Sequence, residues 1–212
     1  KNSNLYLVSL VLVAILGGLL FGYDTAVISG AEQALQKHLG LNAFWHGITA
    51  SSALIGCVIG GAISGVCASR MGRRNSLRLS AVLLFLSALG SYYPEFIFFE
   101  KGDTSFSLIL AFNFYRILGG VGVGLASAIS PMYIAEVAPS EIRGKLVSCN
   151  QFAVIFGMLV VYFVNYMIKD GMTEEMLVSD GWRQMFLSEA YPAAVFAILL
   201  FFVPKTPRYL VM

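Results

Sequence analysis

Long apolar segments alternate with short polar or charged segments along the 212-residue chain. A helix needs about 20 mostly apolar residues to cross the hydrocarbon core of a bilayer. Six segments reach or approach this length, which predicts an all-α membrane protein with six transmembrane helices. The predicted helices cover residues 6–30, 45–68, 76–93, 106–134, 147–168 and 184–203.

The composition supports a membrane protein and excludes several other classes. Hydrophobic residues make up 58% of the chain and charged residues only 12%, whereas soluble domains are about half apolar and about a quarter charged. The net charge of +2 is too small to indicate a nucleic-acid partner. Cys57, Cys67 and Cys149 lie in or beside apolar segments without disulfide or metal spacing. We therefore expect no nucleic acid, no metal and no cofactor.

Lysine and arginine are distributed unevenly between the two sets of loops. Nine of the fourteen lie in the loops at 70–78 and 136–145 or near the two ends of the chain. The opposite loops, at 31–44, 94–105 and 169–183, contain four. Because loops rich in Lys and Arg remain in the cytoplasm, we expect both termini to be cytoplasmic.

Three ionisable side chains lie well inside predicted helices: Asp24, Arg116 and Glu189. Such a residue costs about 2.5–3.5 kcal/mol on insertion scales and normally faces a partner or a water-filled cavity. At a rise of about 1.5 Å per residue, Asp24 and Arg116 reach similar depths. Their opposite charges predict a buried pair, which is either static or a switch that a proton on Asp24 releases. Glu189 is either a second protonatable group or a side chain that reaches the outer interface.

Two predicted helices carry polar side chains along one face. The fifth helix has Gln151, Met158, Tyr162 and Asn165, and the fourth has Asn113, Arg116, Gly120, Gly124 and Ser127. Such seams either hold helices together or line a cavity, and their uncharged groups favour a neutral sugar or polyol over an ion.

Small residues and loop charges add two further expectations. Glycines spaced four apart let helix backbones approach closely, and such pairs occur at Gly56/Gly60, Gly61/Gly65 and Gly120/Gly124. Glu136 and Arg143 have opposite charges at neighbouring helix ends, where a pair can latch in one conformation and open in another.

Five longer motifs stand out along the chain: GGLLFGYDTAVISG at 17–30, GVCASRMGRR at 65–74, YRILGGVGVG at 115–124, PMYIAEVAPSEIRGKL at 131–146 and PKTPRYL at 204–210. Together they resemble the sugar porter family of the major facilitator superfamily. The resemblance implies alternating access between two six-helix halves, each built of two inverted three-helix repeats. Residues 1–212 correspond to the N-terminal six-helix bundle alone, so the C-terminal half is absent from this chain.

The resemblance also implies roles for individual residues. The proton-coupling residues are Asp24, Arg116 and Glu189. The substrate-binding residues are Phe21, Gln151 and Met158. The cytoplasmic gate consists of Arg73, Arg74, Glu136 and Arg143. The apolar Met158 at a sugar-contacting position leaves glucose or another hexose as an alternative to xylose.

The expected function is proton-coupled symport of a monosaccharide, D-xylose or a hexose, across the cell inner membrane. A facilitative sugar uniporter is an alternative, and a non-transporting membrane sugar sensor is a third possibility. An enzyme is disfavoured because no nucleophilic or metal-spaced set of residues occurs, and His38 and His46 lie near an outer loop. The expected partners are the sugar, protons, the lipid bilayer and the missing C-terminal half.

Overall fold

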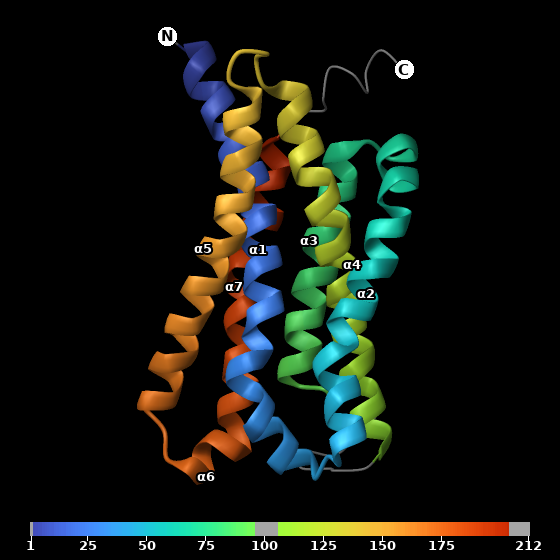
Figure 1. Cartoon of the computed structure of the whole chain (residues 1–212), viewed down its shortest axis with the longest axis vertical. Coiled ribbons are helices and arrows are strands. Elements are labelled where there is room, and N and C mark those ends of the chain that lie inside the picture. Colours follow the sequence, from blue (N-terminus) through green and yellow to red (C-terminus); the bar gives the residue numbers. More distant parts are fainter. Residues whose placement is uncertain (1, 96–105, 204–212) are drawn as a thin grey trace.

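The computed structural model describes residues 2–95 and 106–203, and the PKTPRYL motif lies outside them. Six long helices form one bundle (Figure 1): α1 (Asn2–Leu39), α2 (Ala43–Arg70), α3 (Arg73–Tyr92), α4 (Phe106–Val137), α5 (Arg143–Asp170) and α7 (Trp182–Phe202). The short α6 (Glu174–Met176) and a π-helical turn, η1 (Leu177–Gly181), precede α7. The described part of the chain contains no strand, and the predicted all-α class is confirmed.

The main difference from the predicted elements lies at the end of the first helix. Residues 31–39 were expected in a loop, yet they continue α1 to Leu39. Ala31, Ala34 and Leu35 are buried at helical spacing, so this segment is amphipathic and packs on the bundle. The chain then turns through Gly40, whose φ of +60° favours glycine.

The helices pair in a reciprocal pattern. The long helices form two sets of three in chain order, α1–α3 and then α4, α5 and α7. The second helix of each set packs along the first helix of the other set, α2 along α4 and α5 along α1. The third helices, α3 and α7, contact each other, and the first helices, α1 and α4, also meet. This pattern is the one expected for two inverted three-helix repeats, α1–α3 and α4, α5 and α7. It places α1 and α4 side by side in the middle of the bundle.

Glycines allow the closest of these contacts. A methyl group added at Gly120 of α4 would overlap the carbonyl oxygen of Ala53 in α2, and one at Gly56 would overlap that of Ile117. Gly60 and Gly124 meet the facing backbone in the same way. The prediction of close packing is therefore confirmed for these two pairs.

The third glycine pair does not follow this prediction. Gly61 and Gly65 are exposed, and an added methyl group at either would meet no atom of the described residues within 4 Å. The spacing of four residues alone therefore does not identify the positions at which a side chain would meet the neighbouring helix.

Arginines join the antiparallel helices α3 and α7 at both ends. Arg78 of α3 donates from Nε to the carbonyl of Leu200 at 3.1 Å. Arg183 of α7 donates from Nη1 to the carbonyl of Tyr92 at 3.1 Å and to Oε2 of Glu95 at 2.8 Å. Carbonyls at the end of a helix have no partner within it, so each helix satisfies the end of the other.

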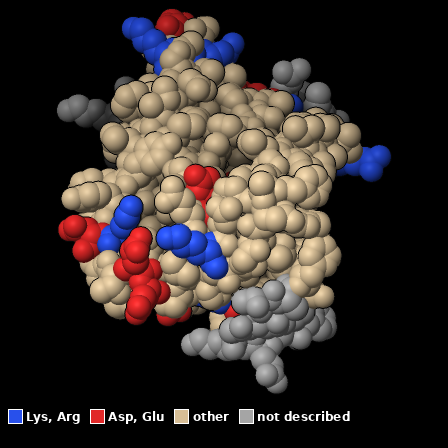
Figure 2. Space-filling view, turned by 60° about the horizontal axis from the view of Figure 1, so that its bottom comes forward, with Lys and Arg blue, Asp and Glu red and all other residues tan. Residues whose placement is uncertain are grey.

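The outer surface of the bundle is largely apolar. Figure 2 shows Lys, Arg, Asp and Glu gathered mostly toward the edges of a broad surface of other residues. Within residues 2–95 and 106–203, five helical segments are long and apolar enough to cross a membrane, namely Leu10–Leu39, Ala43–Arg70, Phe106–Val137, Arg143–Asp170 and Glu174–Phe202. The remaining long helix, α3, begins with arginines and packs between α4 and α7.

We expect Gly120→Ala to destabilise the full-length protein although alanine favours helix. The added methyl group forces α2 and α4 apart, and such overpacking costs about 1–3 kcal/mol. The matched control is Gly144→Ala in α5, where the new side chain meets no described atom. Thermal unfolding in detergent measures both, and an unchanged melting temperature for Gly120→Ala would contradict the packing.

Candidate functional site

The two central helices meet through a buried ion pair. Nη1 of Arg116 in α4 lies 2.7 Å from Oδ1 of Asp24 in α1, and Nη2 also donates to the Asp24 carbonyl at 3.4 Å. Each residue is only 1% exposed. The guanidinium carbon lies 5.1 Å from the ring centre of Phe186 in α7, which adds a cation–π contact. The predicted buried pair is confirmed.

A pocket of about 190 Å³ opens beside this pair, between α1, α2 and α4. Its wall includes Phe21, Asp24 and Thr25 of α1, Cys57 of α2 and Arg116 of α4. Phe21 therefore lies next to the buried carboxylate, as its position one turn earlier predicts. The volume is below the roughly 300–1,000 Å³ of typical small-molecule pockets, so further surface is needed to enclose a ligand.

Glu189 is a second buried carboxyl group close to this pair. It is 0% exposed and interacts electrostatically with both Asp24 and Arg116. Neither carboxyl oxygen has a hydrogen-bond partner among the described residues. The alternative in which Glu189 reaches the outer interface is therefore wrong, because the side chain points into the bundle.

The two expected binding residues of α5 do not line this pocket. Gln151 is exposed, and Met158 is half-buried against α1. The expected polar seam also divides, since Tyr162 is exposed whereas Asn165 is buried and donates to the Val27 carbonyl at 3.2 Å. Helical spacing places these residues on one face, but their burial depends on where the neighbouring helix leaves room.

The expected seam on α4 is mostly a packing surface. Gly120 and Gly124 contact α2, and the hydroxyl of Ser127 donates to the Gly124 carbonyl within its own helix at 2.9 Å. Asn113 is buried, and only Arg116 of this set lines the pocket beside Asp24. Of the two alternatives for this seam, helix packing therefore describes most of its residues.

The four residues expected to form a gate lie at one end of the bundle, and their pairing differs from the expected latch. Nη2 of Arg73 lies 2.8 Å from Oε1 of Glu136, and both side chains are about 8% exposed. Arg143 instead donates to the Ala138 carbonyl at 3.4 Å, and Arg74 donates to a carbonyl just after α7 at 3.3 Å. Glu136 therefore joins α4 to α3, because the Arg73 guanidinium at the start of α3 lies closer to its carboxylate than the Arg143 guanidinium of α5 does.

One contact near the site was missed at the sequence level. Oη of Tyr23 lies 2.7 Å from Oγ of Ser188, which joins α1 to α7. The sequence offered one indication of this contact, since Tyr23 directly precedes Asp24 and Ser188 directly precedes Glu189.

Comparison with known proteins gives consistent matches. The model of the family described as Sugar (and other) transporter matches residues 10–212. The D-xylose-proton symporter of Escherichia coli (strain K12) is 53% identical over 223 residues, which cover 99% of this chain and 45% of that protein. The Glucose facilitated diffusion protein of Zymomonas mobilis is 34% identical over 220 residues, covering 100% of this chain and 46% of that protein.

A solved structure agrees with the whole described bundle. It is the major facilitator superfamily proton:xylose symporter XylE bound to 6-bromo-6-deoxy-D-glucose, and it matches with a TM-score of 0.93 at 50% identity. The match covers 99% of this chain and 47% of that structure. The chain thus spans about half the length of the curated relatives it matches.

We expect Arg116→Leu to destabilise the full-length protein by about 3–5 kcal/mol, because it leaves the Asp24 carboxylate buried without its partner. Adding Asp24→Asn should recover part of this loss, since the unpaired charge is removed. Thermal unfolding of both single variants and the double variant measures the coupling. Strictly additive losses would mean that the two side chains do not interact.

Proposed function

Because this chain belongs to the Sugar (and other) transporter family, we propose that it forms the N-terminal half of a proton-coupled monosaccharide symporter that works by alternating access. The observation that carries this proposal is the buried pair between Asp24 and Arg116. It joins the two central helices and also lines the pocket that contains Phe21. A group that takes up a proton and a group that contacts the sugar therefore share one helix.

The ion pair supplies a way to couple the two events. While Asp24 is ionised, Arg116 holds it and keeps α1 against α4. A proton on the Asp24 carboxylate removes its charge, so the pair loses its Coulomb attraction. The contact between α1 and α4 then weakens, and the equilibrium between conformations shifts. Glu189, buried within electrostatic range of both, is the second proton-coupling group.

The pocket beside the pair suits part of a neutral sugar. Its wall combines the Phe21 ring with the hydroxyl of Thr25, which already donates to the Phe21 carbonyl at 2.7 Å and retains acceptor capacity. We assign Gln151 and Met158 of α5 to a separate part of the sugar site, because Gln151 is exposed and available to a ligand. The substrate is D-xylose or a hexose, in line with relatives named for xylose and for glucose.

The C-terminal half of the transporter is the partner that would complete this site. Apolar side chains of α2 and α5 are exposed, among them Val58 at 74% and Phe152 at 68%. Exposed apolar faces of this kind mark contact with lipid or another protein surface. We assign the C-terminal half to the faces of α2 and α5 beside the pocket, and the lipid bilayer to the remaining outer surface.

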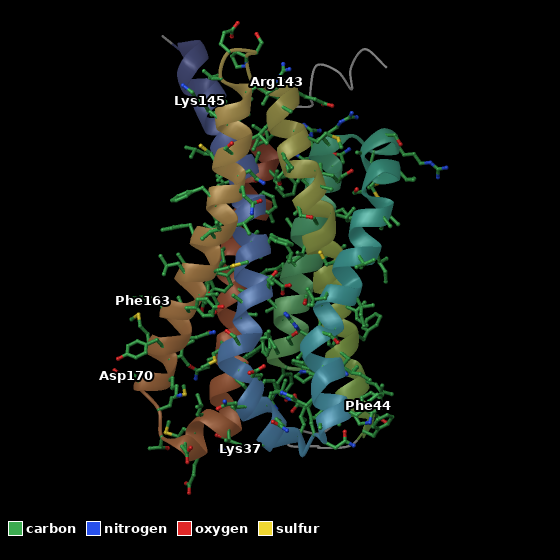
Figure 3. All side chains as sticks on the ribbon, in the orientation of Figure 1. Lys37, Phe44, Arg143, Lys145, Phe163 and Asp170 are labelled. Carbon is green, nitrogen blue, oxygen red and sulfur yellow. The ribbon has the colours of Figure 1, made fainter. Side chains whose placement is uncertain are left out.

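The orientation follows from the charges at the two ends. Arg143 and Lys145 lie at one end of the bundle and Lys37 and Asp170 at the other (Figure 3). The first end also holds the gate residues, so we place it, with both termini, in the cytoplasm and the bundle in the inner membrane. There the pair between Arg73 and Glu136, together with the contacts of Arg74 and Arg143, closes the cytoplasmic end in one conformation and breaks in the other.

A facilitative uniporter is the second candidate. The relative named for glucose facilitated diffusion matches along the whole chain, and a buried ion pair can also hold two helices without taking up a proton. In that case the sugar equilibrates across the membrane and a proton gradient does not change the final ratio.

We expect Asp24→Asn to abolish proton-driven accumulation while leaving sugar exchange intact, because the amide binds no proton at neutral pH. Uptake of labelled xylose and glucose by the full-length protein in proteoliposomes, with and without a proton gradient, measures this. The matched control is Asp170→Asn, since Asp170 is exposed at the end of α5.

Three other outcomes would contradict the proposal. If the Asp24→Asn variant still accumulates sugar against the sugar's own concentration gradient, Asp24 does not take part in proton coupling. If the wild-type protein brings the sugar concentrations inside and outside the proteoliposomes to a ratio of one at every proton gradient, this would indicate the uniporter. Absence of any sugar uptake by folded protein would indicate a sensor.

A further inference from the structure

A contact between two hydroxyl groups joins α1 and α7 at the level of the two buried carboxyl groups. Oη of Tyr23 and Oγ of Ser188 are 2.7 Å apart, and Tyr23 is only 3% exposed. Tyr23 directly precedes Asp24, and Ser188 directly precedes Glu189. Neither hydroxyl lines the pocket beside Asp24, so the contact lies outside the proposed sugar site.

The direction of this hydrogen bond follows from the hydrogens available. Ser188 donates from Oγ to the Met185 carbonyl within α7 at 2.6 Å. A serine hydroxyl has one hydrogen and two acceptor lone pairs, so Tyr23 is the donor and Ser188 the acceptor. The bond is therefore a directed link from α1 to a hydroxyl that α7 already holds in place.

The charged and titratable groups around this link form one small set. Glu189 interacts electrostatically with Asp24 of α1 and Arg116 of α4, and also with the Tyr23 phenol of α1. From α2, the Cys57 thiol lies near Asp24. The interaction between two carboxyl groups depends steeply on their separation in a low-dielectric interior, and coupled groups titrate as a unit.

We propose that Tyr23 and Ser188 are positioning residues whose hydrogen bond sets the separation of Asp24 and Glu189, and through it the pH at which the transporter takes up its proton. This inference rests on the proposed proton coupling and adds a determinant of that step. The link acts on the two carboxyl groups through the adjacent backbone, because each hydroxyl belongs to the residue next to one of them.

We expect Tyr23→Phe to shift the pH midpoint of proton-driven uptake to lower pH. Without the link the two carboxyl groups can move apart, and a more distant carboxylate favours protonation of its neighbour less. A shift of about 0.5 pH unit corresponds to about a threefold loss of proton affinity. The sugar concentration at half-maximal uptake should change less, because the pocket wall is untouched.

The experiment measures labelled-sugar uptake by the full-length protein in proteoliposomes over a series of external pH values. Tyr23→Phe, Ser188→Ala and the double variant should shift the midpoint by the same amount, since they remove two ends of one bond. Ser188→Thr retains a hydroxyl and should keep the wild-type midpoint. The matched control is Tyr191→Phe, because Tyr191 is 69% exposed on α7.

The outcomes separate this inference from the proposed function. Wild-type accumulation that depends on the proton gradient, with midpoints unshifted in the variants, would overturn the inference alone. Loss of both accumulation and sugar exchange in Tyr23→Phe would also overturn it, because the role would then be purely structural. Absence of gradient-dependent accumulation in the wild type would overturn the proposed symport, and the inference with it.

Discussion

A charge inside a membrane-spanning bundle needs a partner of opposite sign, and the pair between Asp24 and Arg116 meets this requirement at the centre of the bundle. Each group alone would lose most of its solvation without compensation. The pair therefore constrains α1 and α4 to lie side by side with their charged positions at the same depth. Glu189 enters the same environment from α7, so three helices converge on one group of charges.

The packing of the other helices follows from this convergence. Since α1 and α4 occupy the centre, α5 and α2 pack along their sides, and glycines such as Gly22 and Gly120 allow backbone contact there. Behind them, α3 and α7 are joined at both ends by Arg78 and Arg183. These arginines satisfy carbonyls at the ends of α7 and α3 that lipid could not satisfy.

The same arrangement explains why the pocket is small and why the proposed sugar site is divided. Phe21 and Asp24 line the pocket beside α2, whereas Gln151 is exposed on α5 and is not among the residues that line this pocket. On the proposed function, the C-terminal half would join these surfaces into one cavity. The contact between Arg73 and Glu136 lies near the C-terminal end of α4, so one helix connects this contact to the ion pair.

The sequence by itself determined the six helices, because length and hydropathy are properties of single segments. It also determined the central pair, because the depth of a charge follows from its position within its own segment, and two opposite charges lie at equal depth. Tertiary structure alone decided that Glu136 pairs with Arg73, that Glu189 is buried, and that a methyl group added at Gly61 would meet no neighbouring helix in the described part of the chain. These outcomes depend on which side of a helix meets its neighbour. Helical spacing defines a face, but only the packing of several helices decides whether that face meets a partner, a pocket or the surface.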